Sequence, residues 1–203
     1  MINELLSTYP LISDQVDKKE LRIVLQELDK VLSLEAPGDV VEFGCYEGTS
    51  SLFMQRVLVQ RQSTKSLHLY DSFAGLPEKT KPDQSPAGEQ FKRGELHARK
   101  PNLIQHFRQA GLTLPTIHKA WFSDLSGDDI PTQIAFAFLD GDFYESIRDS
   151  LRLIEGKLSP GSTIVIDDYQ SEALPGAARA VDEWLKNRRA KVRIEASLAI
   201  VSL

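Results

Sequence analysis

Four short, largely apolar runs of this sequence each end on, or directly beside, an acidic residue. The runs cover residues 39–43, 67–71, 134–139 and 163–166, and the acids are Glu42, Asp71, Asp140 and the pair Asp167-Asp168. Apolar runs without alternation are typical of strands that are covered on both faces of a sheet. In an open sheet of parallel strands, ligands bind beyond the carboxyl ends of the strands. The sequence therefore predicts a binding edge that is acidic.

Segments with a helical pattern lie between these runs. Over residues 18–34 the apolar side chains recur every three or four positions, which indicates an amphipathic helix. Further helices are predicted over about 48–61 and 96–110. Another is marked by an apolar face of Ile147, Leu151, Ile154 and Leu158, and Ser159-Pro160-Gly161 is predicted to end it. The last lies around Val181, Trp184 and Leu185. Strands that alternate with helices predict a doubly wound α/β fold with right-handed crossovers and helices on both faces.

Three further segments complete the organisation that we expect, a single domain over residues 1–203. Residues 116–118 are predicted to be a short strand, and the tail 191–203 one or two closing strands. Residues 72–95 hold three prolines and three glycines, with few aliphatic side chains. A loop of this length in a compact domain is usually functional or disordered. We interpret it as a lid over the binding edge.

Charge and composition exclude several classes of protein. The 203 residues carry 24 Lys and Arg against 29 Asp and Glu, which gives a net charge of −5. Such a chain is poorly suited to bind nucleic acid, because that binding depends on neutralising phosphates. A single cysteine, Cys45, excludes an internal disulfide and a zinc site built from cysteines. Neither a signal peptide nor an apolar stretch of the roughly 18 residues that span a membrane is evident, so we expect a cytoplasmic protein.

The turn after the first run points to a cofactor. Two glycines, Gly44 and Gly48, follow a buried strand in the segment EFGCYEGTS. Their spacing differs from the G-x-G-x-x-G that seats a dinucleotide pyrophosphate, and Glu42 would repel a phosphate but suit a cationic ligand. Asp71 is placed to accept hydrogen bonds from ribose hydroxyls. Together these residues favour an adenosine-containing cofactor with a positive charge; the alternative is a plain strand-to-helix turn.

Carboxylates also end two strands that are neighbours in sequence. Asp140 and Asp142 follow one strand and Asp167-Asp168 the next, and sequential strands usually pair. Like charges held close together are costly unless a cation neutralises them or some become protonated. Oxygen ligands without His or Cys suit a hard ion, Mg²⁺ first and then Mn²⁺ or Ca²⁺. The alternative is that these acids are solvated or cap helices, as Asp142 and Asp168 can do.

Five segments together resemble the class I S-adenosylmethionine-dependent methyltransferases and, more narrowly, the macrocin O-methyltransferase family of metal-dependent sugar O-methyltransferases. In chain order they read VVEFGCYEGTS, LYDSFAGLPE, KAWFSDL, FLDGDFYES and LSPGSTIVIDDY, and they lie within about residues 40–185. The resemblance implies a mostly parallel, seven-stranded, Rossmann-like sheet with helices on both faces. It leaves open whether a homodimer forms.

The resemblance also implies roles for individual residues. Glu42, Gly44 and Gly48 would surround the methionine part of S-adenosyl-L-methionine, and Asp71 would hold its ribose. Ser123 and Asp124 would lie near the adenine. The remaining implied cofactor contacts are Tyr46, Thr49, Ser50, Ser72 and Asp140. The implied Mg²⁺ ligands are Asp140, Asp167 and Asp168, and the implied catalytic groups near the acceptor hydroxyl are Asp140 and Asp142.

The predicted reaction is Mg²⁺-assisted O-methylation of a small molecule with adjacent hydroxyls, a sugar or another vicinal diol. The protein must align the acceptor oxygen, the methyl carbon and the sulfur, and a carboxylate then takes the proton, with Asp140 as the first choice. Two other interpretations stay open. One is a metal-dependent glycosyltransferase that uses Asp140-Gly141-Asp142, and the other is a non-catalytic module that binds S-adenosylmethionine. We expect neither a nucleic acid nor a membrane as partner.

Overall fold

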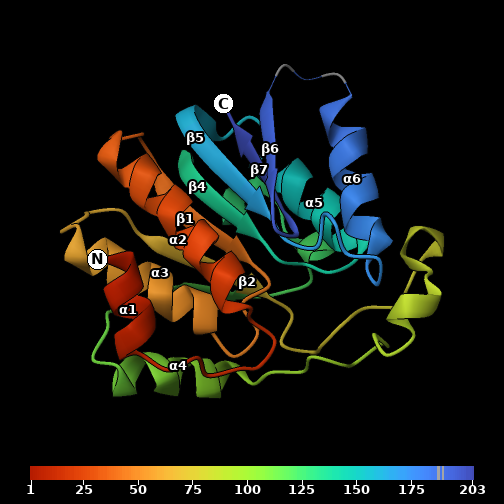
Figure 1. The fold of residues 1–203 in the computed structure, drawn as a ribbon, viewed down its shortest axis with the longest axis horizontal. Helices are drawn as coiled ribbons and strands as arrows, with labels where there is room; N and C mark the ends of the chain where they lie inside the picture. The colour runs from red at the N-terminus through yellow and green to blue at the C-terminus, as the bar shows by residue number, and fades with distance from the viewer. Residues whose placement is uncertain (187, 189) are drawn as a thin grey trace.

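The computed structural model describes residues 1–186, 188 and 190–203, which form one sheet between two layers of helices (Figure 1). The strands are β1 (Asp39–Phe43), β2 (Leu67–Asp71), β3 (Thr116–Lys119), β4 (Ile134–Leu139), β5 (Leu158–Ile166), β6 (Lys191–Glu195) and β7 (Leu198–Ser202). Their order is β3-β2-β1-β4-β5-β7-β6. Strands β1 to β5 pair in parallel, and β7 pairs antiparallel with both β5 and β6. The predicted mostly parallel, seven-stranded sheet is confirmed.

Helices cover both faces of this sheet, as predicted. Helices α1 (Ile2–Thr8), α2 (Lys18–Ser33), α3 (Thr49–Gln60) and α4 (Lys100–Gln109) contribute to one hydrophobic core. Helices α5 (Tyr144–Ile154) and α6 (Pro175–Leu185) contribute to a second core on the opposite face. Short 3-10 turns lie between the longer elements, at Lys81–Asp83, Pro86–Gly88, Phe122–Asp124 and Gly127–Asp129.

Strand β4 explains why the strands are apolar without alternation. All six of its residues are buried. Phe136 and Phe138 pack into the core beneath α2 and α3, whereas Ala137 and Leu139 pack into the core beneath α5 and α6. Because each buried Phe or Leu side chain contributes about 1.5–3 kcal/mol, neither face of the strand tolerates a polar residue.

Two helix boundaries in the prediction are wrong. Helix α4 begins at Lys100 and not at residue 96. Leu96 has a positive φ of 54° and lies in the preceding loop, and Pro101 in the first helical turn favours a start at this point. Helix α5 ends at Ile154, so Leu158 is not part of its apolar face.

The segment Ser159-Pro160-Gly161 does not end a helix but lies inside β5. Ile134 of β4 pairs with Leu158, whereas Phe136 pairs with Thr163, so β5 holds extra residues between these two pairs. A bulge of this kind accommodates Pro160, which has no N–H to donate, and Gly161 with its φ of +81°. The strand is therefore longer than the predicted 163–166.

The N-terminal helix α1 was not predicted. It is only seven residues long, and two of its residues, Leu5 and Leu6, are buried. A helix this short has little stability of its own and depends on packing against its neighbours, here α2 and α3. Among the helices of the described residues, none combines the length and the apolar character needed to cross a membrane.

Candidate active site

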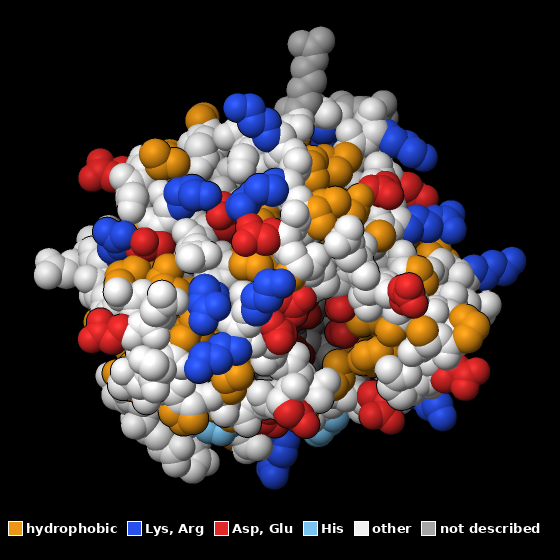
Figure 2. Space-filling model, viewed as in Figure 1, with side chains coloured by type: hydrophobic (Ala, Val, Ile, Leu, Met, Phe, Trp, Pro, Cys, Tyr) orange, Lys and Arg blue, Asp and Glu red, His pale blue; other side chains and the backbone are white. Residues whose placement is uncertain are grey.

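One cavity lies at the carboxyl ends of the central parallel strands. Its wall includes Gly44 after β1, Asp71 at the end of β2, Asp140 after β4 and Asp167 after β5. Figure 2 shows this face of the molecule hollowed between groups of acidic side chains. The structure therefore brings together, in one cavity, the acids at the ends of β2, β4 and β5 and the glycine turn after β1.

The glycine turn forms one wall of this cavity. Gly44 has a φ of +87°, and a Cβ added to it would overlap the backbone oxygen of Asp140. Only glycine lets the chain pass this close to the neighbouring strand end. Gly48, also at positive φ, is the N-cap of α3. Tyr46, Thr49 and Ser50, which the resemblance implied as cofactor contacts, line the cavity beside Gly44.

Hydrogen bonds to the Asp71 side chain connect the end of β2 to the turn that follows β1. Its Oδ2 accepts hydrogen bonds from the backbone N–H groups of Cys45 at 3.0 Å and Tyr46 at 2.9 Å, and its Oδ1 accepts one from Phe73 at 2.7 Å. A carboxylate has about four lone-pair positions, so Asp71 retains room for another donor on the cavity side. Sequence reasoning predicted a ribose contact here and missed that the same carboxylate holds the glycine turn.

Glu42 lies behind the cavity wall and does not line the cavity. Its side chain is fully buried and accepts hydrogen bonds from the hydroxyls of Ser50 and Ser51. Burial raises the pKa of Glu42 to about 7, although these two hydrogen bonds oppose the rise. Glu42 therefore reaches the cavity only through Ser50, and the predicted direct contact with a cofactor finds no support in this geometry.

Four aspartates, Asp140, Asp142, Asp167 and Asp168, line the opposite wall. Burial is the largest cause that raises the pKa of each, to about 7 for Asp142, to about 6 for Asp167 and to about 9 for Asp168. The pKa of Asp140 is raised well above its ordinary value, first by burial and then by Asp167 and Asp142. Asp142 and Asp168 also adopt positive φ angles of 60° and 59°, which are strained for residues other than glycine.

The same four aspartates lack a positively charged neighbour among the described residues. No lysine, arginine or histidine in that part of the chain lines the cavity or forms an ion pair with them. Buried carboxylates without a cation fit the chemistry of a sulfonium or of a hard divalent metal ion. Across residues 1–186, 188 and 190–203, however, no three acidic, histidine or cysteine side chains form a ready metal site.

The rest of the cavity wall was not predicted residue by residue, although the loop over residues 72–95 was interpreted as lying over the binding edge. The segment between α1 and α2 contributes Gln15 and Val16, and the long loop after β2 contributes Leu76, Pro77, Phe91 and Leu96. No local pattern marks these residues, because they meet the cavity only through the tertiary fold. The resulting wall pairs an acidic side with an apolar side, which suits a small molecule that carries hydroxyls on an apolar body.

Glu20 is the missed residue with the clearest chemistry. It lines the cavity, and its Oε1 accepts a hydrogen bond of 2.5 Å from Ser197 Oγ. Ser197 Oγ also lies 3.2 Å from Asp167 Oδ1. In the sequence, Glu20 follows the N-cap Asp17 by three positions, the place of a capping-box residue. This position gives no sign of its contact with Ser197, which lies between β6 and β7.

Four predicted site residues do not line the cavity: Glu42, Gly48 at the start of α3, and the neighbours Ser123 and Asp124. Ser123 and Asp124 are exposed on the 3-10 turn that follows β3 and are not part of the wall. Their neighbours Trp121 and Phe122 do line the cavity, next to Ser72 and Gly141. The predicted proximity of Ser123 and Asp124 to an adenine remains a prediction, and the aromatic pair is the part of this turn that faces the cavity.

The sequence and the fold were compared with known proteins. The sequence model of the Macrocin-O-methyltransferase (TylF) family matches residues 10–200. A 4'-O-methyltransferase of Streptomyces olivaceus, which acts on 8-demethyl-8-(2,3-dimethoxy-alpha-L-rhamnosyl)-tetracenomycin-C, is 33% identical over 153 residues, 72% of this chain. The chain spans 58% of the length of that relative.

Two solved structures share the fold. The O-methyltransferase NovP superposes with a TM-score of 0.80 at 24% identity, over 92% of this chain and 80% of NovP. An O-methyltransferase from Bacillus cereus, solved in complex with S-adenosylhomocysteine (SAH), has a TM-score of 0.64 at 12% identity, over 100% of this chain and 89% of the other. At these identities the likeness concerns the fold. The family match, in contrast, covers the glycine turn, the acidic ends of β2, β4 and β5, and nearly all of the sequence. The chain therefore belongs to the macrocin O-methyltransferase family.

Proposed function

We propose that this chain transfers a methyl group from S-adenosyl-L-methionine to a hydroxyl of a small molecule, with help from Mg²⁺. The observation that carries the proposal is that the glycine turn after β1 and the aspartates after β4 and β5 line one cavity. Family membership supports the same reaction class. The relative from Streptomyces olivaceus acts on a rhamnosyl compound, so a sugar or another vicinal diol is the acceptor class that we favour.

The side of the cavity lined by Gly44, Tyr46, Thr49 and Ser50 would hold the methionine part of the cofactor, and Gly48 would let the chain turn into α3 beside them. A cavity lined by carboxylates and free of described cations favours a ligand with a sulfonium and an ammonium group. Asp71 and Ser72 would bind the ribose, and Trp121 with Phe122 would contact the adenine. The methyl group that the bound cofactor supplies would then point toward Asp140 and Asp142.

Asp140, Asp167 and Asp168 would hold Mg²⁺, because their oxygen-only donor set suits a hard ion. The bound ion would orient two adjacent hydroxyls of the acceptor and lower the pKa of one of them. These side chains would have to change rotamer to share one ion, since no three of the described acids form a ready site. A cation at this place would also relieve the mutual repulsion that raises the pKa values of these carboxyls.

Asp140 or Asp142 would accept the proton that the acceptor hydroxyl loses. A good proton acceptor has a pKa near the working pH, and burial raises the pKa of Asp142 to about 7. The apolar wall of Leu76, Phe91 and Leu96 would exclude water from the reacting atoms. These features support a carboxylate as the base and an apolar surface for the acceptor.

The proposal is tested in two steps. First, isothermal calorimetry measures the binding of SAH to the purified chain, with NAD and a UDP-sugar as controls that should not bind. Second, a methyl-transfer assay with labelled S-adenosyl-L-methionine compares rhamnosides, other glycosides and catechols, each with Mg²⁺ and with EDTA. We expect SAH binding, and transfer to at least one vicinal diol that EDTA abolishes.

Other outcomes would replace the proposal. Binding of a UDP-sugar but not of SAH would favour the glycosyltransferase. SAH binding with no transfer to any acceptor would favour the non-catalytic module. Transfer that EDTA leaves unchanged would retain the methyltransferase and remove the metal from its mechanism.

A further inference from the structure

A buried carboxylate in the long loop between β2 and α4 has no part in the proposed reaction. Asp83, the last residue of the 3-10 turn Lys81–Asp83, is only 1% exposed. It does not line the cavity. A charged side chain is costly to bury unless it is well paired or hydrogen-bonded. The hydrogen-bond partners of Asp83 therefore indicate its structural role.

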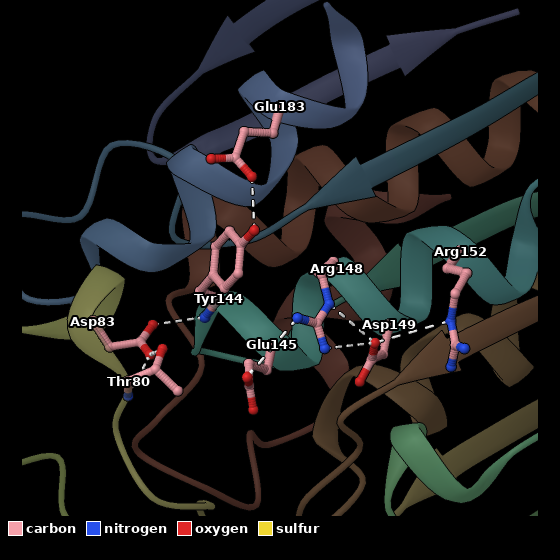
Figure 3. A network of polar contacts seen from close by, with 8 residues as sticks. All are labelled: Thr80, Asp83, Tyr144, Glu145, Arg148, Asp149, Arg152 and Glu183. Atoms are coloured by element: carbon pink, nitrogen blue, oxygen red, sulfur yellow. Dashed lines mark hydrogen bonds and ion pairs between the residues drawn. The ribbon is translucent and has the colours of Figure 1, made fainter.

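Asp83 joins its own loop to the start of α5 (Figure 3). Its Oδ2 accepts hydrogen bonds from Thr80 N at 2.9 Å and Thr80 Oγ1 at 2.6 Å. Its Oδ1 accepts one from the backbone N–H of Tyr144 at 2.6 Å, across 61 positions of sequence. Tyr144 is the first residue of α5, and the N-cap Phe143 has no side-chain acceptor of its own. Asp83 thus caps a helix whose own sequence cannot do so.

Helix α6 also contacts Asp83 and Tyr144, and we call the place where the loop, α5 and α6 meet the junction. A Cβ added to Gly176 would overlap Asp83 Oδ1 and lie 2.8 Å from Tyr144 N, so a glycine is required where the three segments meet. Tyr144 in turn donates a hydrogen bond of 2.6 Å from its hydroxyl to Glu183 of α6. Farther along the loop, Ser85 Oγ donates to the backbone oxygen of Glu172 at 2.6 Å. The middle of the loop is therefore fastened to both helices on this face.

The junction lies between two parts of the candidate active site. On one side, residues 140–143 lead directly into Tyr144, and the turn is tight because Phe143 N donates to Gly141 O at 2.6 Å. On the other side, the same loop supplies Leu76, Phe91 and Leu96 to the cavity wall. Leu76 also packs with Phe143 in a small hydrophobic cluster. Asp83 thus connects the apolar wall to the turn that carries Asp140 and Asp142.

We propose that Asp83 is a positioning residue that fixes the position of this apolar wall relative to the Asp140–Asp142 turn. That the wall contacts an acceptor rests on the proposed function; the anchor itself is a property of the fold. Without the carboxylate, the loop would lose its bond to α5, and the first turn of α5 would lose its cap. Both the wall and the turn would then open more often, while the glycine turn after β1 would be unaffected.

Hydrogen exchange read by mass spectrometry tests this on the whole chain. The variants are Asp83→Ala, which removes both acceptor oxygens and with them the cap of α5, and Thr80→Val, which removes one hydrogen bond to Asp83. Thr80→Ser, which keeps the hydroxyl, and Glu89→Gln, which alters an exposed acid of the same loop, are the matched controls. Peptides from residues 76–96 and 140–147 report the two sides of the junction, and peptides from β1 serve as reference.

We expect exchange at least about tenfold faster in both reporting regions for Asp83→Ala, a smaller effect for Thr80→Val, and no change in β1 or in the two controls. SAH affinity measured by calorimetry should stay within about twofold of the unchanged protein. Faster exchange in residues 76–96 alone, or equally in every peptide, would overturn the proposal. If the unchanged protein does not bind SAH, the proposed function fails, but the exchange pattern still decides the role of Asp83.

Discussion

The carboxylate of Glu42 accepts a hydrogen bond from the hydroxyl of Ser50, which connects the carboxyl end of β1 to the first turn of α3 directly behind the cavity wall. Ser50 lines the cavity, whereas Glu42 is fully buried. The acid can therefore influence a bound cofactor only by orienting Ser50. Because burial raises the pKa of Glu42 to about 7, its charge also changes near neutral pH.

Replacing Glu42 by glutamine should change how stability depends on pH. The native protein keeps the Glu42 proton up to about pH 7, while the unfolded chain releases it near pH 4.5. The group therefore adds stability at low pH that is lost as the pH rises through 7. The expected loss between pH 5 and 8 is about 2 to 3 kcal/mol, which Glu42→Gln should remove. Urea unfolding at both pH values measures it.

The matched control for this experiment is Glu89→Gln, which alters an exposed acid away from the cavity. Its free energy of unfolding should follow that of the unchanged protein at every pH. If the curve of Glu42→Gln also runs parallel to that of the unchanged protein, then Glu42 does not hold its proton to neutral pH and the assigned pKa is wrong.

Gly44→Ala should be among the most disruptive small substitutions in the chain. The new Cβ would overlap the backbone oxygen of Asp140 and would also require a φ of +87°. We expect a loss of about 3 kcal/mol or more and no detectable SAH binding. Gly111→Ala is the control, because Gly111 has a φ of +65° but no atom within 4 Å of a Cβ, so about 1 kcal/mol is expected. Equal losses in urea unfolding would contradict a steric role for Gly44.

The strand ends of this fold were predictable, because their signals are local. Strand β4 is buried on both faces, so it reads as an unbroken apolar run, and its end at Asp140 can be placed from sequence. The pairing of β4 with β5 follows from the tendency of sequential strands to neighbour each other, which brings Asp140 beside Asp167. These two facts suffice to predict an acidic cavity at this edge.

The other contacts in and around the site could not be predicted, because they join residues that are distant in sequence. Glu20 meets Ser197 across 177 positions, and Asp83 meets Tyr144 across 61. In each case the local sequence suggests something simpler, a helix cap for Glu20 and a charged loop residue for Asp83. The extra residues in β5 were missed for a related reason, since Pro160-Gly161 normally ends an element and only the pairing with β4 reveals a bulge.

Asp140→Asn and Asp167→Asn should each lower methyl transfer by at least about 100-fold, because they remove a proton acceptor or a ligand for the metal ion. SAH affinity should remain within a few-fold of that of the unchanged protein, since the glycine turn is intact. Asp128→Asn, at an exposed acid outside the cavity, is the control and should retain full activity. A double variant of Asp140 and Asp167 that is still fully active would exclude a mechanism that depends on the metal.

Mg²⁺ should stabilise the protein, and more so at higher pH. Burial and Asp167 raise the pKa of Asp168 to about 9, so in the absence of metal this carboxyl keeps its proton at neutral pH and must release it to bind the ion. At a Mg²⁺ concentration ten times its dissociation constant, the gain is about 1.4 kcal/mol, or a rise in Tm of roughly 3 to 6 °C. Thermal unfolding at pH 6.5 and 8.5, with NaCl at matched ionic strength as the control, measures it. We expect the larger shift at pH 8.5 and none for Asp168→Asn; an equal shift with NaCl, or one that survives in the variant, would mean that these aspartates do not bind the ion.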